Sequence, residues 1–182
     1  MDRLFSRRRV VTWGAAGVAL PLAVAGTGHA DPVPGFGRSD LVFDVTRFGA
    51  KGDGVRIDSD AVNRAIDAAA SAGGGTVYFP SGTYASYSIR LRSNVALYLA
   101  LNATLLAAAP ANGQGYDPAE PGAGNPFQDF GHSHWHNSLI WGEGLTNLVI
   151  GGPGTIDGKG LIASGSKESM PLQGNKMIAL KL

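Results

Sequence analysis

The chain reads Phe43-Asp-Val-Thr-Arg-Phe-Gly-Ala-Lys-Gly-Asp-Gly54, continues through an alanine-rich segment, and resumes with Gly73-Gly-Gly-Thr-Val-Tyr-Phe-Pro-Ser-Gly-Thr-Tyr84. The first run predicts a strand, Leu41–Val45, followed by a loop over Phe48–Gly54 in which glycines permit a positive φ. The last run predicts a strand that stops at Pro80. This stretch therefore contains a strand, a glycine loop, a helix and a second strand in immediate succession.

The alanine-rich segment is predicted to be helical from about Asp60 to Ala72, because its apolar residues recur at spacings of three and four. Asp58 or Ser59 is expected to cap the first turn by accepting backbone N–H bonds. Gly73-Gly74-Gly75 is expected to end the helix. A helix with one apolar face, placed ahead of a run of strands, suits the cap that the first coil of a β-solenoid requires. The apolar stripe comprises Val62, Ala65, Ile66, Ala69 and Ala72.

Short apolar runs separated by turns follow this helix. Corners such as Gly152-Pro153-Gly154 and Gly142-Glu143-Gly144 differ from the two-residue Asn-Gly turns of hairpins. They favour parallel coils, although the pattern alone also allows an antiparallel sandwich. Asn94, Asn102 and Asn147 lie at strand ends, where asparagine side chains can bond the turn backbone. The expected strands are Thr76–Phe79, Ser88–Leu91, Val95–Leu99, Ala103–Leu106, Ser138–Trp141, Asn147–Ile150, Thr155–Asp157 and Met177–Leu180.

Residues 1–30 are predicted to be an export signal and not part of the fold. Arg3 and Arg7-Arg8-Arg9 make a basic start, and the apolar run Val10–Ala25 is too short and too glycine-rich for a stable membrane anchor. Ala30 follows small residues that a signal peptidase reads. The Arg7-Arg8 pair resembles a twin-arginine signal, and an ordinary secretory signal is the alternative. Either signal predicts a secreted or periplasmic protein, with the export machinery as a transient partner.

Residues 31–182 are expected to form the N-terminal part of a β-helix domain. Without the signal the chain has a net charge of about −2 and no basic stripe, so a nucleic-acid partner is not expected. The sequence contains no cysteine, so disulfides cannot contribute to stability. Burial and hydrogen bonding must therefore stabilise the fold, which suits a solenoid with a continuous core.

A proline-rich segment, Ala107–Gly131, is predicted to be a long irregular loop that leaves one corner of a coil. Loops of this kind are often functional, but a disordered insertion without a role is an equal alternative. The chain then reads Gly131-His-Ser-His-Trp-His-Asn-Ser-Leu-Ile-Trp-Gly-Glu143. In an extended strand His132, His134 and His136 would point to one face, where three imidazoles could hold zinc.

A sugar-facing cleft explains this composition better than a metal site does. Aromatic rings stack on the apolar faces of sugars, and imidazoles bind hydroxyl groups. His132, His134 and Trp135 are therefore predicted to bind substrate. Trp141 could also stack on a sugar, although a place in the core is favoured for it. For His132 to His136, a structural role in which the backbone satisfies the imidazoles is an equal alternative.

Three stretches, Phe48–Tyr84, Gly131–Glu143 and Gly152–Gly160, together resemble bacterial glycoside hydrolase family 28, the polygalacturonase-like enzymes of the pectin-lyase-like superfamily. The resemblance implies an all-β fold, a right-handed parallel β-helix with an N-terminal capping α-helix. It also implies inverting hydrolysis of α-linked galacturonate chains by two carboxyl groups. Pectic polysaccharide is then the expected partner, and no cofactor is implied.

The catalytic aspartate motifs of that family are absent, and the resemblance places them on coils beyond Leu180. No catalytic residue is therefore assigned. Asp157 is expected to form a turn, while Glu143 and Asp129 lack a partner carboxylate. The chain is expected to be an N-terminal portion, truncated before the later coils and inactive alone. A calcium-dependent polysaccharide lyase of the same fold and a noncatalytic carbohydrate-binding β-helix remain alternatives.

Overall fold

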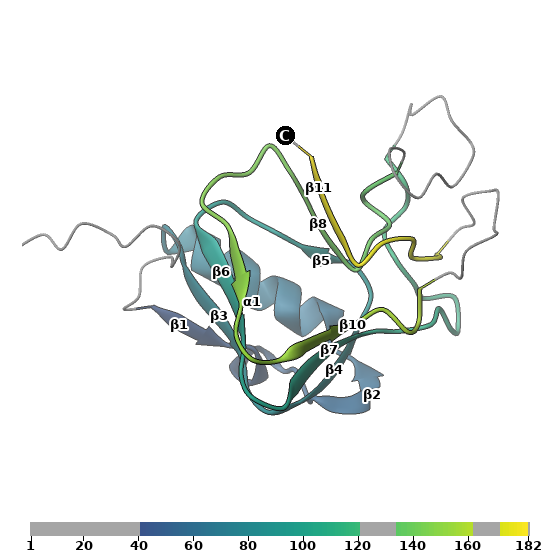
Figure 1. Ribbon diagram of the computed structural model, residues 1–182, viewed down its shortest axis with the longest axis horizontal. Coiled ribbons are helices and arrows are strands. Elements are labelled where there is room, and N and C mark those ends of the chain that lie inside the picture. The colour runs from purple at the N-terminus through teal and green to yellow at the C-terminus, as the bar shows by residue number, and fades with distance from the viewer. Residues whose placement is uncertain (1–40, 121–133, 162–171, 182) are drawn as a thin grey trace, which may run out of the picture. The chain divides into compact units, whose positions relative to one another are not determined.

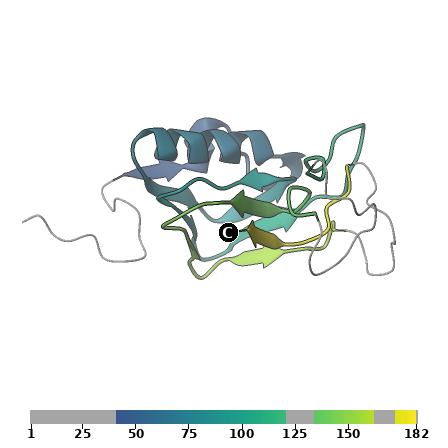
Figure 2. The same cartoon turned by 90° about the horizontal axis from the view of Figure 1, so that it is seen from above.

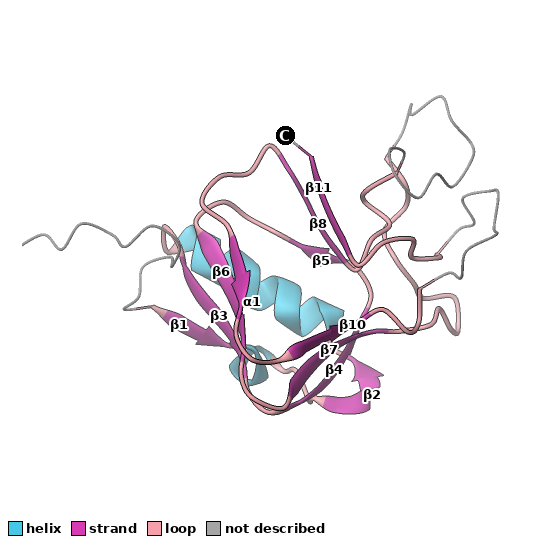
Figure 3. Cartoon of the chain, in the orientation of Figure 1, coloured by secondary structure: helices cyan, strands magenta, loops and turns pink. Residues whose placement is uncertain are grey.

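The computed structural model describes residues 41–120, 134–161 and 172–181 of the chain, shown in Figures 1 and 3. The predicted export signal, residues 1–30, lies outside the described residues. The elements are β1 (Val42–Asp44), the 3₁₀ helix η1 (Val45–Phe48), β2 (Asp53–Ile57), α1 (Ser59–Ser71), β3 (Gly75–Phe79), β4 (Gly82–Ser86), β5 (Ile89–Arg90), β6 (Val95–Leu99), β7 (Ala103–Ala107), β8 (Ile140–Glu143), β9 (Val149–Gly151), β10 (Thr155–Asp157) and β11 (Ile178–Lys181).

These strands form three parallel sheets that the chain visits in turn. Sheet A has the strand order β1-β3-β6-β9, sheet B has β10-β7-β4-β2, and sheet C has β11-β8-β5. One coil therefore comprises β3, β4 and β5, the next β6, β7 and β8, and a third β9, β10 and β11. Followed from β3 to β6 in Figure 1, the chain turns anticlockwise while later coils lie nearer the viewer. The fold is thus the predicted right-handed parallel β-helix.

Ahead of the first full coil, α1 takes the place of a strand in sheet C. β1 and β2 begin sheets A and B, and α1 then lies along the end of the strand stack, as Figure 2 shows. Its buried face includes Val62, Ala65, Ile66 and Ala69, as the apolar stripe predicts. Ala72 is exposed, contrary to the prediction, because it lies after the last turn as the C-cap residue. The helix therefore covers the core at this end.

Asp58 occupies the N-cap position, as predicted, but neither candidate side chain caps the first turn, because both bind other segments. The carboxylate of Asp58 accepts the backbone N–H groups of Lys51 at 2.8 Å and Gly52 at 2.9 Å. The hydroxyl of Ser59 accepts the N–H of Tyr87 at 2.6 Å. Asp58 thus fixes the glycine loop, and Ser59 joins the helix start to the segment before β5.

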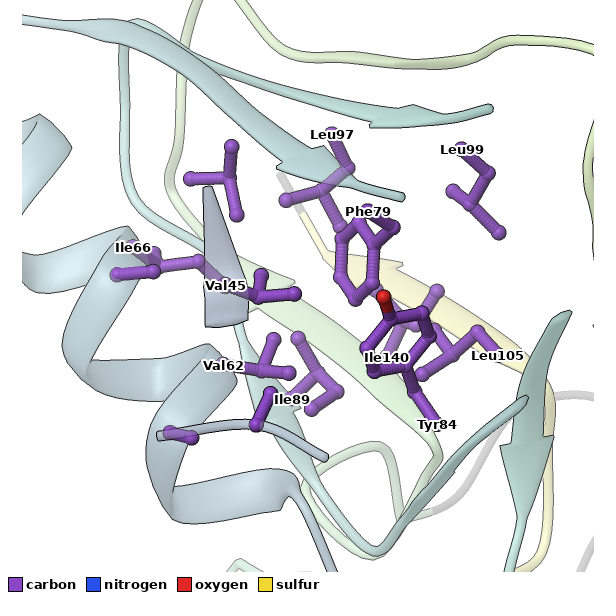
Figure 4. Packing of buried hydrophobic residues seen from close by; sticks show 14 of the residues in the cluster. Val45, Val62, Ile66, Phe79, Tyr84, Ile89, Leu97, Leu99, Leu105 and Ile140 are labelled. Atoms are coloured by element: carbon purple, nitrogen blue, oxygen red, sulfur yellow. The ribbon is translucent and has the colours of Figure 1, made fainter. Parts of the chain in front are cut away.

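The core consists of side chains stacked in register from coil to coil (Figure 4). Val77 pairs with Leu97 in sheet A, and both are at most 1% exposed. Tyr84 pairs with Leu105 in sheet B, and Ile89 pairs with Ile140 in sheet C. Fully burying a side chain of this size contributes about 1.5–3 kcal/mol. Repetition of such stacked positions stabilises the solenoid without disulfides.

Left-handed asparagines form the corners between sheets. Asn94, Asn102 and Asn147 have φ values of 65°, 61° and 55°. Their predicted position at strand ends is confirmed, but the amides of Asn94 and Asn147 bond each other, with Nδ2 of Asn147 donating to Oδ1 of Asn94 at 2.8 Å. Gly152 is needed at another corner, since its φ is 105° and a Cβ there would lie 2.1 Å from the carbonyl oxygen of Leu99.

Some predicted boundaries differ from the structure. The loop predicted over Phe48–Gly54 is shorter, because Phe48 ends η1 and Asp53 begins β2. The predicted corner Gly142-Glu143-Gly144 is wrong, since Gly142 and Glu143 belong to β8. β4 lies where the sequence signals a turn after Pro80.

Asn63 on α1 replaces the strand that sheet C lacks beside β5. Its Nδ2 donates to the carbonyl of Ser88 at 2.9 Å, and its Oδ1 accepts the N–H of Arg90 at 2.8 Å. A parallel neighbouring strand would bond these same two groups on either side of Ile89. One side-chain amide, which carries both a donor and an acceptor, therefore closes this edge of the sheet.

Two long connections leave the same corner of successive coils. One joins β7 to β8 and the other joins β10 to β11, so both pass from sheet B to sheet C. Residues 108–120 of the first contain no named helix or strand, as predicted for the proline-rich segment. In the described part of the chain, no helix has the length and apolar character needed to cross a membrane. The corner between sheets B and C is therefore where the described coils have their longest connections.

Replacing Asn63 with aspartate is expected to lower the free energy of unfolding by about 1–3 kcal/mol, because the donor to the carbonyl of Ser88 is lost. Urea denaturation measures this change. Ser71→Ala, at an exposed position of the same helix, is the control and should alter stability by less than about 0.5 kcal/mol. An Asn63→Asp variant as stable as the control would contradict the strand-replacing role.

Candidate functional site

A cluster of aromatic, imidazole and charged side chains lies on the outer face of sheet C. Along β8, Ile140 is buried whereas Trp141 and Glu143 face outward, since side chains alternate on a strand. β11 places Lys181 in register with Glu143, and β5 places Arg90 in register with Trp141. Strands from three coils thus bring four charged or aromatic side chains to one surface.

Trp141 is part of this surface, so the prediction that it lies in the core is wrong. Its indole Nε1 donates to Oδ2 of Asp117 at 2.9 Å. Its ring lies against the imidazole of His136, with centroids 4.0 Å apart and planes inclined by 31°. The apolar residues before Trp141 are buried, but the alternation of β8 turns the indole outward.

Asp117 ties the connection between β7 and β8 to this surface. Its two carboxylate oxygens accept Nε and Nη2 of Arg90 at 2.8 and 2.5 Å. Its backbone N–H donates to the hydroxyl of Ser88 at 3.0 Å. A bidentate arginine–carboxylate pair fixes orientation as well as charge, so Asp117 holds both the loop and the indole of Trp141 in place.

Glu120 is a buried carboxylate in the same connection, with 8% of the residue exposed. Its Oε2 accepts the backbone N–H groups of Trp135 at 3.0 Å and His136 at 3.3 Å, and its Oε1 lies 3.3 Å from Nδ1 of His134. Burial raises the pKa of Glu120, but hydrogen bonds from backbone N–H groups outweigh burial and hold that pKa below its usual range. The charged carboxylate therefore fixes the turn that presents Trp135 and His136.

The histidine segment forms a turn, and not the extended strand assumed for a zinc site. His134 has a φ of 59°, so strand alternation does not align its side chain with that of His136. His132 lies outside the described residues. Within the residues that the structure describes, no three metal-binding side chains gather as a metal site would require. The geometric premise of the zinc interpretation is thus wrong for His134 and His136.

The predicted substrate-binding residues occupy different depths. His134 is 5% exposed, and its carbonyl oxygen accepts Nδ2 of Asn175 and Nζ of Lys176, both at 2.9 Å. Trp135 is half-buried at the edge of the outer surface. His134 therefore lies beneath the surface that Trp135 helps to form.

Lys181 connects Trp135 with the outward end of β8. Its ammonium lies 3.9 Å from the centroid of the Trp135 ring and 3.2 Å from Oε1 of Glu143. This hydrogen-bonded lysine is the main reason that the pKa of Glu143 lies below its usual range. Nε2 of His136 lies 3.6 Å from Oε2 of Glu143, which is too long for a hydrogen bond. The surface thus combines aromatic rings with charges that are already paired.

Several residues of this cluster could not be found from sequence motifs. Glu120 and Asp117 lie in an irregular loop, where no periodicity indicates direction. Arg90 and Lys181 reach the surface through strand register between coils, a relation that spacing along the chain does not show. Asp157, by contrast, has the predicted turn role, since its carboxylate accepts the N–H of Lys159 at 2.9 Å.

Residues 42–175 match the family model described as rhamnogalacturonase A/epimerase, pectate lyase-like. The chain belongs to this family. Together with the parallel β-helix, this match places it in the pectin-lyase-like superfamily, as the resemblance to glycoside hydrolase family 28 implies. The outer surface of sheet C is therefore the candidate site of a pectate lyase-like protein.

Individual proteins are also similar to this chain in sequence and in structure. A probable polygalacturonase from Vitis vinifera is 34% identical over 128 residues, which are 62% of this chain and 23% of that protein. The structure of a family 28 exopolygalacturonase from Yersinia enterocolitica is 30% identical with a TM-score of 0.51, over 68% of this chain and 22% of that chain.

Alginate lyase 7 from Azotobacter vinelandii is 61% identical over 44 residues, which are 24% of this chain and 5% of that protein. The matched part of this chain thus spans less than a quarter of the length of each of these three relatives.

Glu120→Gln is expected to destabilise the protein by about 1–3 kcal/mol at neutral pH, because a charged acceptor of two backbone N–H groups is lost. The pKa of Glu120 is lowered in the folded state, so its contribution is present above the ordinary value of 4.5 and is lost as the pH falls through the folded pKa. The stability difference between wild type and variant should therefore shrink below pH 4.5. Urea denaturation at neutral and acidic pH measures it.

Glu143→Gln provides the control for Glu120, since Glu143 is exposed and its ion pair is screened by solvent. This variant should change stability much less than Glu120→Gln at neutral pH. A Glu120→Gln effect that stayed constant from neutral to acidic pH would contradict the role of its charge.

Proposed function

We propose that this chain supplies the first coils of an exported glycoside hydrolase that cleaves pectic polysaccharide by inverting hydrolysis. The family match and the polygalacturonase relatives support this assignment. The observation that carries it is the outward cluster of Trp135, His136 and Trp141 on sheet C, held by buried and paired carboxylates. Such a surface suits a sugar chain, whose rings stack on aromatic side chains.

Sugar contact would use the rings and polar edges of this surface. Trp135 and Trp141 offer indole rings, and His136 offers an imidazole between them. Arg90 and Lys181 place positive charge beside these rings, although each is paired with a carboxylate. The surface would therefore accept a uronate chain through stacking and hydrogen bonds first, with charge as a secondary contribution.

Within this proposal the three predicted substrate-binding residues have separate roles. Trp135 contacts the sugar, and His134 supports it from beneath through its contact with Glu120. His132, which lies outside the described residues, is proposed to bind the sugar as well. The roles of all three can be separated by single substitutions.

The carboxylates described in this cluster are poorly suited to catalysis. Inverting hydrolysis needs an acid with a raised pKa and a base, their carboxyl groups about 6.5–9.5 Å apart. The pKa values of Glu120 and Glu143 are both lowered, so neither favours the protonated form needed for an acid. Asp117 already accepts bonds from Arg90 and Trp141. We therefore propose that the 182-residue chain alone is inactive.

Exposed apolar residues support the proposal that further coils belong to the functional protein. On β11, Ile178 and Leu180 are in register with the buried Ile140 and Gly142, yet they are 43% and 58% exposed. A following coil would cover them as β11 covers β8. The catalytic aspartates that the family resemblance implies would lie on such coils.

A polysaccharide lyase is the second candidate, and the identity with alginate lyase 7 over 44 residues favours it. A lyase would break the chain by β-elimination and leave an unsaturated sugar that absorbs ultraviolet light. A hydrolase would release reducing ends without that absorbance. The two reactions are therefore distinguishable in one sample.

Export is the remaining part of this proposal and depends on residues 1–30. The basic start and apolar run favour secretion to the periplasm or medium. Fractionation of bacteria that produce the full chain tests it. Retention of the uncleaved chain in the cytoplasm would contradict it.

The purified 182-residue chain is expected to release no reducing ends from polygalacturonate above the buffer control, since Asp117, Glu120 and Glu143 of this cluster are poorly suited to act as the acid. A reducing-sugar assay with an active polygalacturonase as positive control measures this. Ultraviolet absorbance of the same samples detects elimination. Release proportional to protein concentration would contradict the proposed inactivity, and a calcium-dependent rise in absorbance would instead support the lyase.

A further inference from the structure

The outer face of sheet A carries two stacked tyrosines that the sheet C surface does not use. Tyr78 on β3 and Tyr98 on β6 are in register, with ring centroids 6.1 Å apart and planes inclined by only 16°. Both are half-buried and alternate with fully buried neighbours such as Leu97. The two rings therefore form one aromatic stack that faces outward.

The next position in this row is a glycine. Gly151 on β9 is in register with Tyr98, where any larger side chain would lie beside the tyrosine ring. Successive strands are about 4.8 Å apart, so the space above Tyr98 is as thick as one ring. Gly151 itself places no side chain in this space.

The backbone does not require glycine at this position. Gly151 has no positive φ, and a Cβ built there would meet only Cγ1 of Val149, at 3.8 Å, an ordinary contact. The adjacent Gly152 differs, because its φ is 105° and its Cβ would lie 2.1 Å from a backbone oxygen of Leu99. Packing and conformation thus account for Gly152 but leave Gly151 unexplained.

We propose that Tyr98, left uncovered by Gly151, is a stacking platform for a pyranose ring of a polysaccharide. A sugar ring presents a flat face of C–H groups, which the electron-rich face of an aromatic ring attracts. The ring-thick space beside Tyr98 matches such a ligand, and the tyrosine hydroxyl can bond sugar hydroxyl groups. The underlying Tyr78 holds the ring of Tyr98 parallel to the stack.

This platform is distinct from the outer surface of sheet C, since it lies on another sheet of the coil. It contains no carboxylate or imidazole, so its chemistry is binding and not catalysis. Neutral and acidic pyranoses should both bind, because stacking depends on the sugar face and not on charge. The platform would give the protein a second contact with a polysaccharide chain.

Gly151→Val tests this inference because it covers the ring of Tyr98 while leaving both tyrosines in place. Valine suits an extended strand, so the thermal midpoint of unfolding should not fall. Thr76→Val, on β3 of the same outer face in a different row, is the matched control. The 182-residue chain labelled with ¹³C in its tyrosine rings is titrated with trigalacturonate and, separately, with cellotriose.

Wild type and Thr76→Val should show saturable shifts of the Tyr98 ring resonances with both sugars. Gly151→Val should weaken this binding by at least about tenfold, equivalent to about 1.4 kcal/mol. Unmoved Tyr98 resonances in wild type, or an unchanged affinity in folded Gly151→Val, would overturn the inference. Binding sensed by the tryptophans of sheet C alone would overturn it while leaving the proposed function intact.

Discussion

In-register hydrogen bonding between successive coils is the constraint on which the structure depends. Every strand of a parallel β-helix needs a neighbour, because unpaired backbone groups at a sheet edge invite other pairings. At the first coil, α1 covers the apolar core, and the amide of Asn63 bonds the two backbone groups flanking Ile89. Because the strands of successive coils pair in register, each inward apolar side chain packs against an apolar side chain of the next coil.

The same register builds the candidate site from residues far apart in the chain. Arg90, Trp141, Glu143 and Lys181 come from three coils, yet they share the outer face of sheet C. Two carboxylates in the connection between β7 and β8 complete it: Asp117 orients the indole of Trp141, and Glu120 fixes the turn at residues 134–136. The paired strands thus position the side chains of the site, while the carboxylates of the β7–β8 connection orient them.

The sequence predicted the features that depend on local chemistry. Three glycines ended the helix, asparagines marked strand ends, and the apolar runs of β6 and β7 were placed nearly to the residue. The capping of α1 was mispredicted because Asp58 binds the glycine loop, a contact between segments that no local propensity reveals.

The strands β2 and β4 were missed because their sequences resemble turns and β2 exposes Val55. The site was harder to predict than the fold, since it depends on the direction in which each side chain points. Trp141 has apolar neighbours typical of a core, but alternation along β8 turns it outward. His134 and His136 have strand spacing, yet a left-handed turn at His134 separates them. Glu120 carries no motif, and only its two backbone contacts identify its role.

We propose that the aromatic surface of sheet C contacts pectic sugars. Titration of ¹⁵N-labelled protein with trigalacturonate, followed through the indole N–H resonances, tests it most directly. We expect saturable shifts for Trp135 and Trp141, while Trp13 in the predicted signal segment stays unmoved. Indole resonances of Trp135 and Trp141 that do not move at the highest sugar concentration would contradict the proposed contact.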